Sequence, residues 1–377
     1  MRLLPFAIFS ALTASAQAAE QPTTEELKKA LEEQAKKIEQ LEAKLNTTIE
    51  AMEATPTSNT NSRTNIGGYG ELHYNNFGTQ EDIDFHRFVL FISHKFNERL
   101  RFFSELEVEH SYSGEGKPGA VELEQAYVEY DVNNSTTLKS GLFLVPVGLL
   151  NETHEPDTFY GVERNPIEKN VIPTTWWEAG ASASFRFGEG LTLDFAAHSG
   201  LEVDVADFDI RGGRQKVAKA NADAFAYTTR LKYTGVPGLE VAAVIQHQDD
   251  ITQGIADASA QLFETHVAYQ SGAFGLKALY AQWDIDSELA DNLGKDKQNG
   301  YFVEPSYKLS EEIGFFARYS VWDNEAGSAS IVDTENRQVN VGVNYWLHPN
   351  VVFKFDTENR LGAQDGSGYN VGFGYQF

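Results

Sequence analysis

Cysteine is absent from the 377 residues, so no disulfide framework holds this fold together. Long apolar runs are also missing, because no stretch beyond the N-terminus approaches the roughly 18 residues of a membrane-spanning helix. Positive charge is scarce: 30 Lys and Arg residues face 55 Asp and Glu residues, which leaves a net charge of −25. That balance argues against nucleic acid as a partner, since a phosphate backbone requires a basic face.

The common catalytic motifs are missing as well. The chain contains no G-x-S-x-G, no H-E-x-x-H and no glycine-rich phosphate loop ahead of a helix. His154, Glu155 and Asp157 could be interpreted as metal ligands, but their spacing matches no metal-binding motif. We therefore expect no enzyme, no cofactor and no metal site.

The first residues predict an export signal. Arg2 provides a positive start, residues 3–12 form a short apolar run, and residues 16–18 (Ala-Gln-Ala) fit a cleavage site. We assign residues 1–18 to a cleaved signal peptide. The alternative is a membrane anchor, although the apolar run is too short to cross about 30 Å of hydrocarbon.

Residues 19–54 are expected to form an α-helix. From residue 24 onward this stretch is rich in Glu, Lys, Ala and Leu and contains no Gly, Pro or aromatic residue. Its apolar residues recur with the heptad spacing of a coiled-coil seam: Leu27, Leu31, Ile38, Leu41, Leu45 and Met52. A coiled coil would join several copies of the chain, whereas the alternative is a single solvated amphipathic helix. Residues 55–64 have the composition of a flexible linker.

From residue 65 to residue 377 the hydrophobic pattern has a period of two, which is typical of strands. Apolar residues alternate with small or polar ones in about sixteen segments, which are joined alternately by short turns and longer loops. This pattern predicts an all-β fold, a sixteen-stranded antiparallel transmembrane β-barrel with a wet lumen. The predicted strands are 66–75, 83–96, 99–110, 121–132, 136–144, 176–187, 190–199, 223–234, 238–248, 261–271, 273–283, 299–309, 312–322, 335–346, 350–360 and 367–377.

Aromatic residues favour a membrane barrel over a soluble β-sandwich, because only the barrel needs aromatic girdles at two interfaces. Every second strand ends on an outward aromatic, as in the C-terminal pair Tyr375 and Phe377. An even number of strands places both ends of the barrel, and the N-terminal helix, in the periplasm. Tryptophans gather at the opposite, outer ends of the strands, where a second girdle is expected: Trp176, Trp177, Trp283 and Trp322.

The connection between the fifth and sixth predicted strands, residues 145–175, is unusually long. Its four prolines and its apolar content predict an ordered loop. We expect it to fold into the lumen and narrow it, whereas the alternative is a lid over the outer rim. The predicted constriction combines Glu152, His154, Glu155, Asp157, Glu163 and Arg164 of the loop with Arg87, Arg101, Lys139, Glu105 and Glu107 of the barrel wall.

Acids and bases at inward wall positions are nearly equal in number, so they either set ion selectivity or form ion pairs across the wall. Because the long loop is acidic, we predict a field across the pore and a modest preference for cations. Acidic residues in the other outer loops are expected to be solvated, or to hold divalent cations that bridge lipopolysaccharide.

Two segments resemble a known family. Residues 126–130 and 138–148 are similar to the strands that lead into the third loop of the phosphate-selective porin O and P family, and residues 84–90 to its second strand. The terminal residues through Phe377 resemble the signal read by the barrel assembly machinery.

This resemblance implies a trimeric, sixteen-stranded porin in the outer membrane of a Gram-negative bacterium. Such a protein contacts membrane lipid and lipopolysaccharide and passes small hydrophilic solutes or ions. The best-known members carry a ladder of basic residues for phosphate, but here the basic residues of the lumen are matched by acids. A general diffusion porin is therefore expected, with an anion- or phosphate-selective porin and a surface-loop receptor or adhesin as alternatives.

Overall fold

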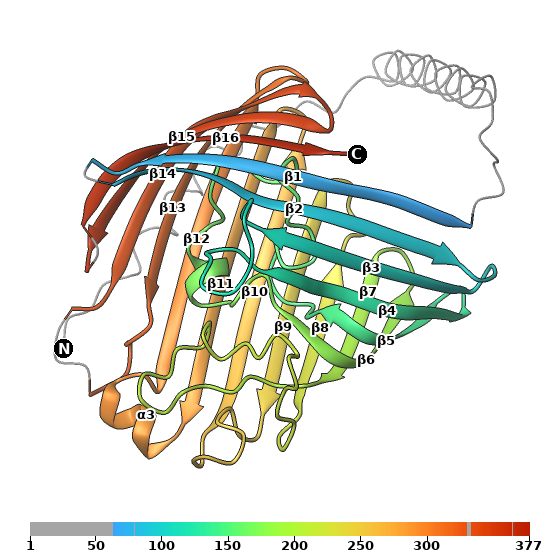
Figure 1. The fold of residues 1–377 in the computed structure, drawn as a ribbon, viewed down its shortest axis with the longest axis vertical. Helices are drawn as coiled ribbons and strands as arrows, with labels where there is room; N and C mark the ends of the chain where they lie inside the picture. Colours follow the sequence, from blue (N-terminus) through green and yellow to red (C-terminus); the bar gives the residue numbers. More distant parts are fainter. Residues whose placement is uncertain (1–62, 79, 330–332, 364) are drawn as a thin grey trace, which may run out of the picture. The chain divides into compact units, whose positions relative to one another are not determined.

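The computed structural model describes residues 63–78, 80–329, 333–363 and 365–377. Over these residues the chain forms one closed barrel of sixteen antiparallel strands, in which β1 and β16 pair to close the ring (Figure 1). The predicted signal peptide, N-terminal helix and most of the linker lie outside the described residues. The strands are β1 (Thr64–Asn76), β2 (Glu81–Lys95), β3 (Leu100–Glu109), β4 (Val121–Asn133), β5 (Thr136–Leu144), β6 (Trp177–Phe187), β7 (Leu191–His198), β8 (Ala226–Tyr233), β9 (Leu239–Gln248), β10 (Ser259–Ser271), β11 (Phe274–Asp286), β12 (Lys297–Lys308), β13 (Ile313–Asp323), β14 (Asn336–His348), β15 (Val351–Gly362) and β16 (Gly366–Gln376).

The prediction of sixteen strands is confirmed, and the observed ends lie close to the expected ones. The largest differences are three residues, for example at the start of β8, expected at residue 223 and observed at Ala226. The alternation that defined the strands is visible in β15. Phe353 and Phe355 are 44% and 43% exposed on the outside, while Lys354 and Asp356, which alternate with them, are buried inside.

The expected girdle at the end of the barrel with the short turns is also present. The aromatic residues that finish every second strand, or directly follow it, are all exposed on the outer surface: Phe96, Tyr130, Phe187, Tyr233, Tyr269, Tyr307, Tyr345 and Phe377. The C-terminus closes the ring, because Gly68 and Phe377 exchange two backbone hydrogen bonds of 2.9 and 2.8 Å.

The expected tryptophan girdle at the opposite end is wrong. Trp176, Trp177, Trp283 and Trp322 are buried, and three of them belong to an apolar cluster enclosed by the barrel. Their indole rings pack against loops that enter the lumen and do not face lipid. A position near a strand end does not show which way a tryptophan points, because inward and outward side chains occur equally close to strand ends.

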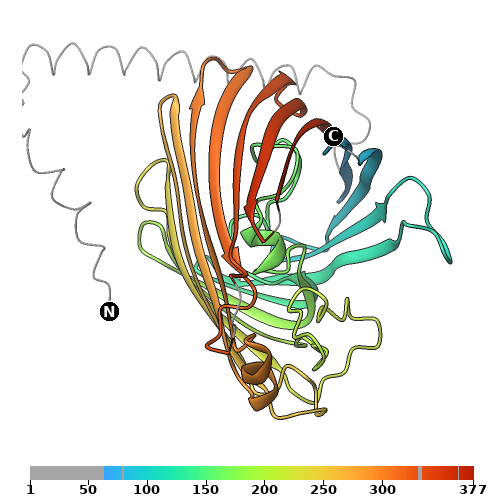
Figure 2. The same cartoon turned by 90° about the vertical axis from the view of Figure 1, so that its left-hand side faces the viewer.

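Two loops enter the barrel from the end opposite the short turns. The first is residues 145–176, called the inner loop here, and contains the short helix α2 (Ile167–Asn170), which the strands surround (Figure 2). The second, residues 199–225, lies against the first. A further short helix, α3 (Glu288–Leu293), follows β11. No described helix is long and apolar enough to cross a membrane.

Candidate functional site

The base of the inner loop is fastened by a buried amide. Asn151 Nδ2 donates to the carbonyl oxygens of Val145 and Trp176, at 2.7 and 2.8 Å. Its Oδ1 accepts from the Trp176 backbone N–H at 2.7 Å. One side chain therefore joins the first and last residues of the loop, which fixes the angle at which the chain enters the lumen.

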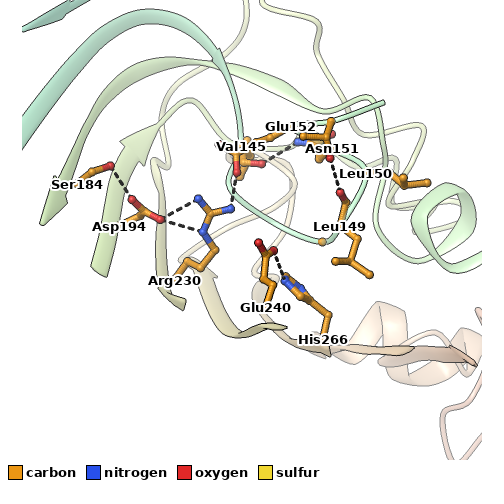
Figure 3. Close-up of polar contacts among 12 residues, drawn as sticks. Val145, Leu149, Leu150, Asn151, Glu152, Ser184, Asp194, Arg230, Glu240 and His266 are labelled. Atoms are coloured by element: carbon orange, nitrogen blue, oxygen red, sulfur yellow. Dashed lines mark hydrogen bonds and ion pairs between the residues drawn. The ribbon is translucent and has the colours of Figure 1, made fainter. Parts of the chain in front are cut away.

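A buried carboxylate holds the middle of the loop in shape. Glu168 Oε1 accepts from the backbone N–H groups of Leu149 and Leu150, at 2.7 and 2.6 Å (Leu149 and Leu150 are labelled in Figure 3). Its Oε2 accepts from Asn165 Nδ2 at 2.7 Å. Because buried polar groups are stable only when they are paired, this network favours one conformation of the loop.

The far end of the loop reaches the opposite wall. Asp356 Oδ2 on β15 accepts from the Val162 backbone N–H at 2.8 Å, and Arg318 Nη2 on β13 donates to the Tyr160 carbonyl at 2.7 Å. Asn344 Nδ2 on β14 donates to the Phe159 carbonyl at 3.0 Å. The loop therefore crosses the lumen, as expected, and does not lie as a lid over the outer rim.

Glu152, an exposed acid of the loop, pairs with a wall base that was not predicted to be its partner. Glu152 forms an ion pair with Arg230 on β8, and Arg230 Nε also donates to Asp194 Oδ2 on β7 at 2.9 Å (Figure 3). Ser184 Oγ donates to the other oxygen of Asp194 at 2.6 Å. Two carboxylates thus share one guanidinium, so these three side chains together carry more negative than positive charge.

The remaining predicted loop acids have separate partners. Glu163 Oε1 lies 3.1 Å from His73 Nδ1 and accepts from Asn75 Nδ2 at 3.1 Å, both on β1. Asp157 contributes its backbone carbonyl, which lies 3.4 Å from Trp346 Nε1. The acids of the loop are therefore spread around the ring and do not face a single basic stripe.

Of the predicted wall bases, only Lys139 lies beside the loop acids. A cavity of about 280 Å³ is lined by Lys139, Glu105, Glu152, His154 and Glu155, among others.

The other two predicted wall bases are engaged elsewhere. Arg87 is buried and lies 2.8 Å from Glu71 and 3.6 Å from Glu107. Arg101 binds Glu129 and Asp131, neighbours on β4. These contacts fit the interpretation in which wall charges form ion pairs with one another.

The second inward loop brings arginines that the sequence analysis did not single out. Arg211 Nη1 donates to the carbonyls of Lys169 and Thr174, at 3.1 and 2.7 Å. Arg214 Nη1 donates to the carbonyl of Thr175. Burial, together with the neighbouring guanidinium groups of Arg214 and Arg164, lowers the pKa of Arg211 below its usual value. No local pattern points to this contact, because the two loops are distant in sequence.

Open space remains on both sides of the inner loop. A cavity of about 630 Å³ lies at the end with the short turns, and its lining includes Glu240, Lys277 and Lys308. A cavity of about 240 Å³ lies on the other side and includes Glu163 and Arg360 in its lining. The charged side chains in both linings suit hydrated solutes.

Residues 7–356 match the family of Gram-negative porins. The chain belongs to this family. A porin of this kind is a passive-diffusion channel of the outer membrane, and its lumen and inner loop agree with that role. The match is to Gram-negative porins as a whole. It does not identify the narrower phosphate-selective family that the sequence resembles.

Known proteins resemble this porin at low identity. An uncharacterized protein of Aquifex aeolicus (strain VF5) is 29% identical over 330 residues, which cover 77% of this chain and 74% of that protein. An anion-selective porin from Comamonas acidovorans shares the fold with a TM-score of 0.60 and 13% identity, over 83% of this chain and 99% of that one. OmpT of Vibrio cholerae, folded in vitro and in a trimer form, gives a TM-score of 0.57 with the same identity and coverage.

Proposed function

We propose that this porin passes small hydrophilic solutes and ions beside the inner loop, and that the loop gives the passage a modest preference for cations. The observation that carries this is the ion pair between Glu152 and Arg230. The Glu152 side chain is 36% exposed, whereas that of Arg230 is 8% exposed. A passing ion therefore meets the carboxylate first, and the base lies behind it, shared with Asp194.

The preference is expected to be weak and to depend on salt. Glu105 and Glu155 also line this cavity, but Lys139 lines it as well and partly offsets their charge. Interactions between charges in a wet lumen are screened as the Debye length falls from about 30 Å at 0.01 M to about 10 Å at 0.1 M salt. Selectivity set by these side chains should therefore fade over that range.

Reversal potentials of the purified protein in planar bilayers test this proposal. Glu152→Gln removes the exposed acid and should shift the reversal potential toward anions, while Arg230→Gln leaves two acids and should shift it toward cations. Glu98→Gln, in an exposed turn outside the lumen, is the matched control and should change nothing. Absence of any shift in both lumen variants would count against the loop as the source of selectivity.

An anion- or phosphate-selective channel is the second candidate. It is supported by Arg164, Arg211 and Arg214, whose guanidinium groups gather where the two inward loops meet. A wild-type channel that strongly prefers chloride, or whose chloride current is blocked by phosphate, would favour this candidate over the first. The same recordings distinguish the two.

The assembly and processing of the protein are proposals as well. We propose a homotrimer, supported by the trimer form of OmpT from Vibrio cholerae. We also propose that residues 1–18 are removed on export and that residues 19–54 form a periplasmic coiled coil, with residues 55–64 as a linker. The exposed aromatic C-terminus supports recognition by the barrel assembly machinery, and the apolar outer surface supports contact with lipid and lipopolysaccharide.

A further inference from the structure

Three buried polar atoms meet where the inner loop touches the barrel wall. They are Nε2 of His154 in the loop, Oε1 of Glu105 on β3 and Oε2 of Glu124 on β4. The three residues are only 3%, 1% and 1% exposed. Among the described residues, none forms a hydrogen bond with any of these three atoms. The three atoms face one another at ion-pair distances without a hydrogen bond, and a buried polar atom that makes no hydrogen bond costs about 1–3 kcal/mol, so three at one point require an explanation.

Two of the three distances between these atoms match those between the ligands of a metal ion. Nε2 of His154 lies 3.5 Å from Oε1 of Glu105 and 3.6 Å from Oε2 of Glu124, and all three atoms lie within 4.8 Å of one another. Ligands held about 2.0–2.2 Å from a tetrahedral zinc ion are about 3.3–3.6 Å apart. The observed distances are too long for hydrogen bonds of normal geometry but suit an ion placed between the atoms.

Groups around the site orient the ligands as metal sites require. Nδ1 of His154 lies 3.2 Å from the carbonyl oxygen of Asn151, so Nδ1 carries a proton and Nε2 is the ring nitrogen directed at the two carboxylates. The second oxygen of Glu105 accepts from Gln125 Nε2 at 2.6 Å. In both His154 and Glu105, one polar atom is therefore engaged in a hydrogen bond, and the other is left to bind a metal ion.

A β-bulge brings the two carboxylates together. Glu105 pairs with Gln125 and the next residue, Leu106, pairs with Leu123, so Glu124 is an extra residue in β4. Bulges of this kind turn a side chain in a new direction. The bulge turns Glu124 toward Glu105, and the inner loop then places His154 against the pair. The adjacent 280 Å³ cavity, which Glu105 and His154 line, gives access from the lumen.

A second group of possible ligands provides a contrast. Asp84, His86 and His110 also lie within 4.8 Å of one another, but their ligand atoms already pair among themselves. Nδ1 of His86 and Nδ1 of His110 lie 3.1 and 2.7 Å from the two oxygens of Asp84. This group is partly open to the lumen and is satisfied without an ion, so it carries no metal proposal.

We propose that Glu105, Glu124 and His154 bind one divalent transition-metal ion of the zinc class, which ties the inner loop to strands β3 and β4. The two carboxylates and the neutral imidazole supply two negative charges, which such an ion neutralises. The expectation of no metal site from the sequence was based on the spacing of His154, Glu155 and Asp157. The ligands identified here come from three separate segments, so no spacing motif joins them.

The competing arrangement has a protonated His154 placed between the two carboxylates as an ion pair. A metal titration of the full-length protein in detergent, after removal of metals with a chelator, separates the two. Cobalt(II) is the probe, because its visible absorption reports coordination by protein ligands and zinc displaces it. We expect one cobalt(II) ion per chain with tetrahedral-type absorption. A wild-type protein that binds no cobalt(II) at micromolar concentration supports the ion pair and overturns the proposal.

Variants assign the ligands. Glu124→Gln and His154→Gln should each weaken cobalt binding by at least tenfold, whereas His110→Gln, from the contrasting group, should leave it unchanged. Heat-dependent migration on gels identifies barrels that have folded. If the Glu124 and His154 variants do not fold, the wild-type titration and His110→Gln remain informative. Loss of the ion in His110→Gln with retention in His154→Gln would place the site elsewhere and overturn the assignment.

Discussion

At the scale of single residues, Asn151 should determine whether the inner loop stays in place. Its side chain makes three hydrogen bonds that join Val145 to Trp176, and it is fully buried. Asn151→Ala leaves the Trp176 backbone N–H without a partner, at a cost of about 1–3 kcal/mol, and removes one of the two hydrogen bonds that each of the Val145 and Trp176 carbonyls accepts. We expect a loop that detaches from its base, seen as faster proteolysis within residues 145–176 and as noisier single-channel current.

Thr153→Ala is the matched control for this prediction. Thr153 lies two residues away and is exposed, and its hydroxyl donates to the carbonyl of Leu149 at 2.8 Å. Removing an exposed hydroxyl should change stability by no more than about 0.5 kcal/mol. Equal proteolysis of the two variants would mean that the amide of Asn151 does not hold the loop.

Which residues carry charge into the lumen could be predicted from the sequence, but their partners could not. Arg230 and Asp194 stand at inward positions of neighbouring strands, which alternation alone establishes. The third member, Glu152, arrives from a loop 78 residues away in the chain. Glu124 was missed, although the outward residues change from odd numbers at Leu123 to even numbers at Val128, and such a change indicates a bulge.

At the scale of elements, the strands were predictable because their pattern is local. Each strand needs only a period of two and a turn signal at either end, and both are visible within about ten residues. The inner loop has no period, and its conformation depends on contacts with β1, β8, β13, β14 and β15. Its length and prolines therefore predicted that it would be ordered, but not which wall it would touch.

The inner loop itself is the element that should limit the current. Replacing residues 148–173 with a short Gly-Ser linker leaves β5 and β6 paired with each other, because their hydrogen bonds do not involve the loop. We expect a folded barrel whose single-channel conductance rises several-fold and whose ion preference weakens. Shortening residues 111–119, an outer loop on the other side of β4, is the control and should leave conductance unchanged. A loop-deleted barrel with wild-type conductance would show that the narrowest point lies elsewhere.

At the scale of the whole molecule, the strands of the described residues form a closed ring. The pairing of β1 with β16 runs from Tyr69 to Asn76, and the last backbone bonds join Gly68 to Phe377. Among the described residues, the contacts that complete the ring are made from Gly68 onward. Association of several barrels depends on different groups. A closed ring has no free strand edge, so neighbouring barrels can contact it through side chains but not through unpaired backbone groups.

Deleting residues 20–60 should therefore separate folding from assembly. We expect a barrel that still migrates as a folded, heat-modifiable species, while the proposed trimer dissociates at lower temperature in mild detergent than that of the full-length protein. The reason is that a coiled coil buries its seam only when several chains meet. Changing the seam residues Leu31, Ile38 and Leu45 to Asn should reproduce the effect, because polar groups at these positions destabilise the buried seam. Lys36→Asn, at an outward heptad position of the same stretch, should not. Trimers of equal thermal stability in the deletion, the seam variant and the full-length protein would mean that the barrel walls alone hold the subunits together.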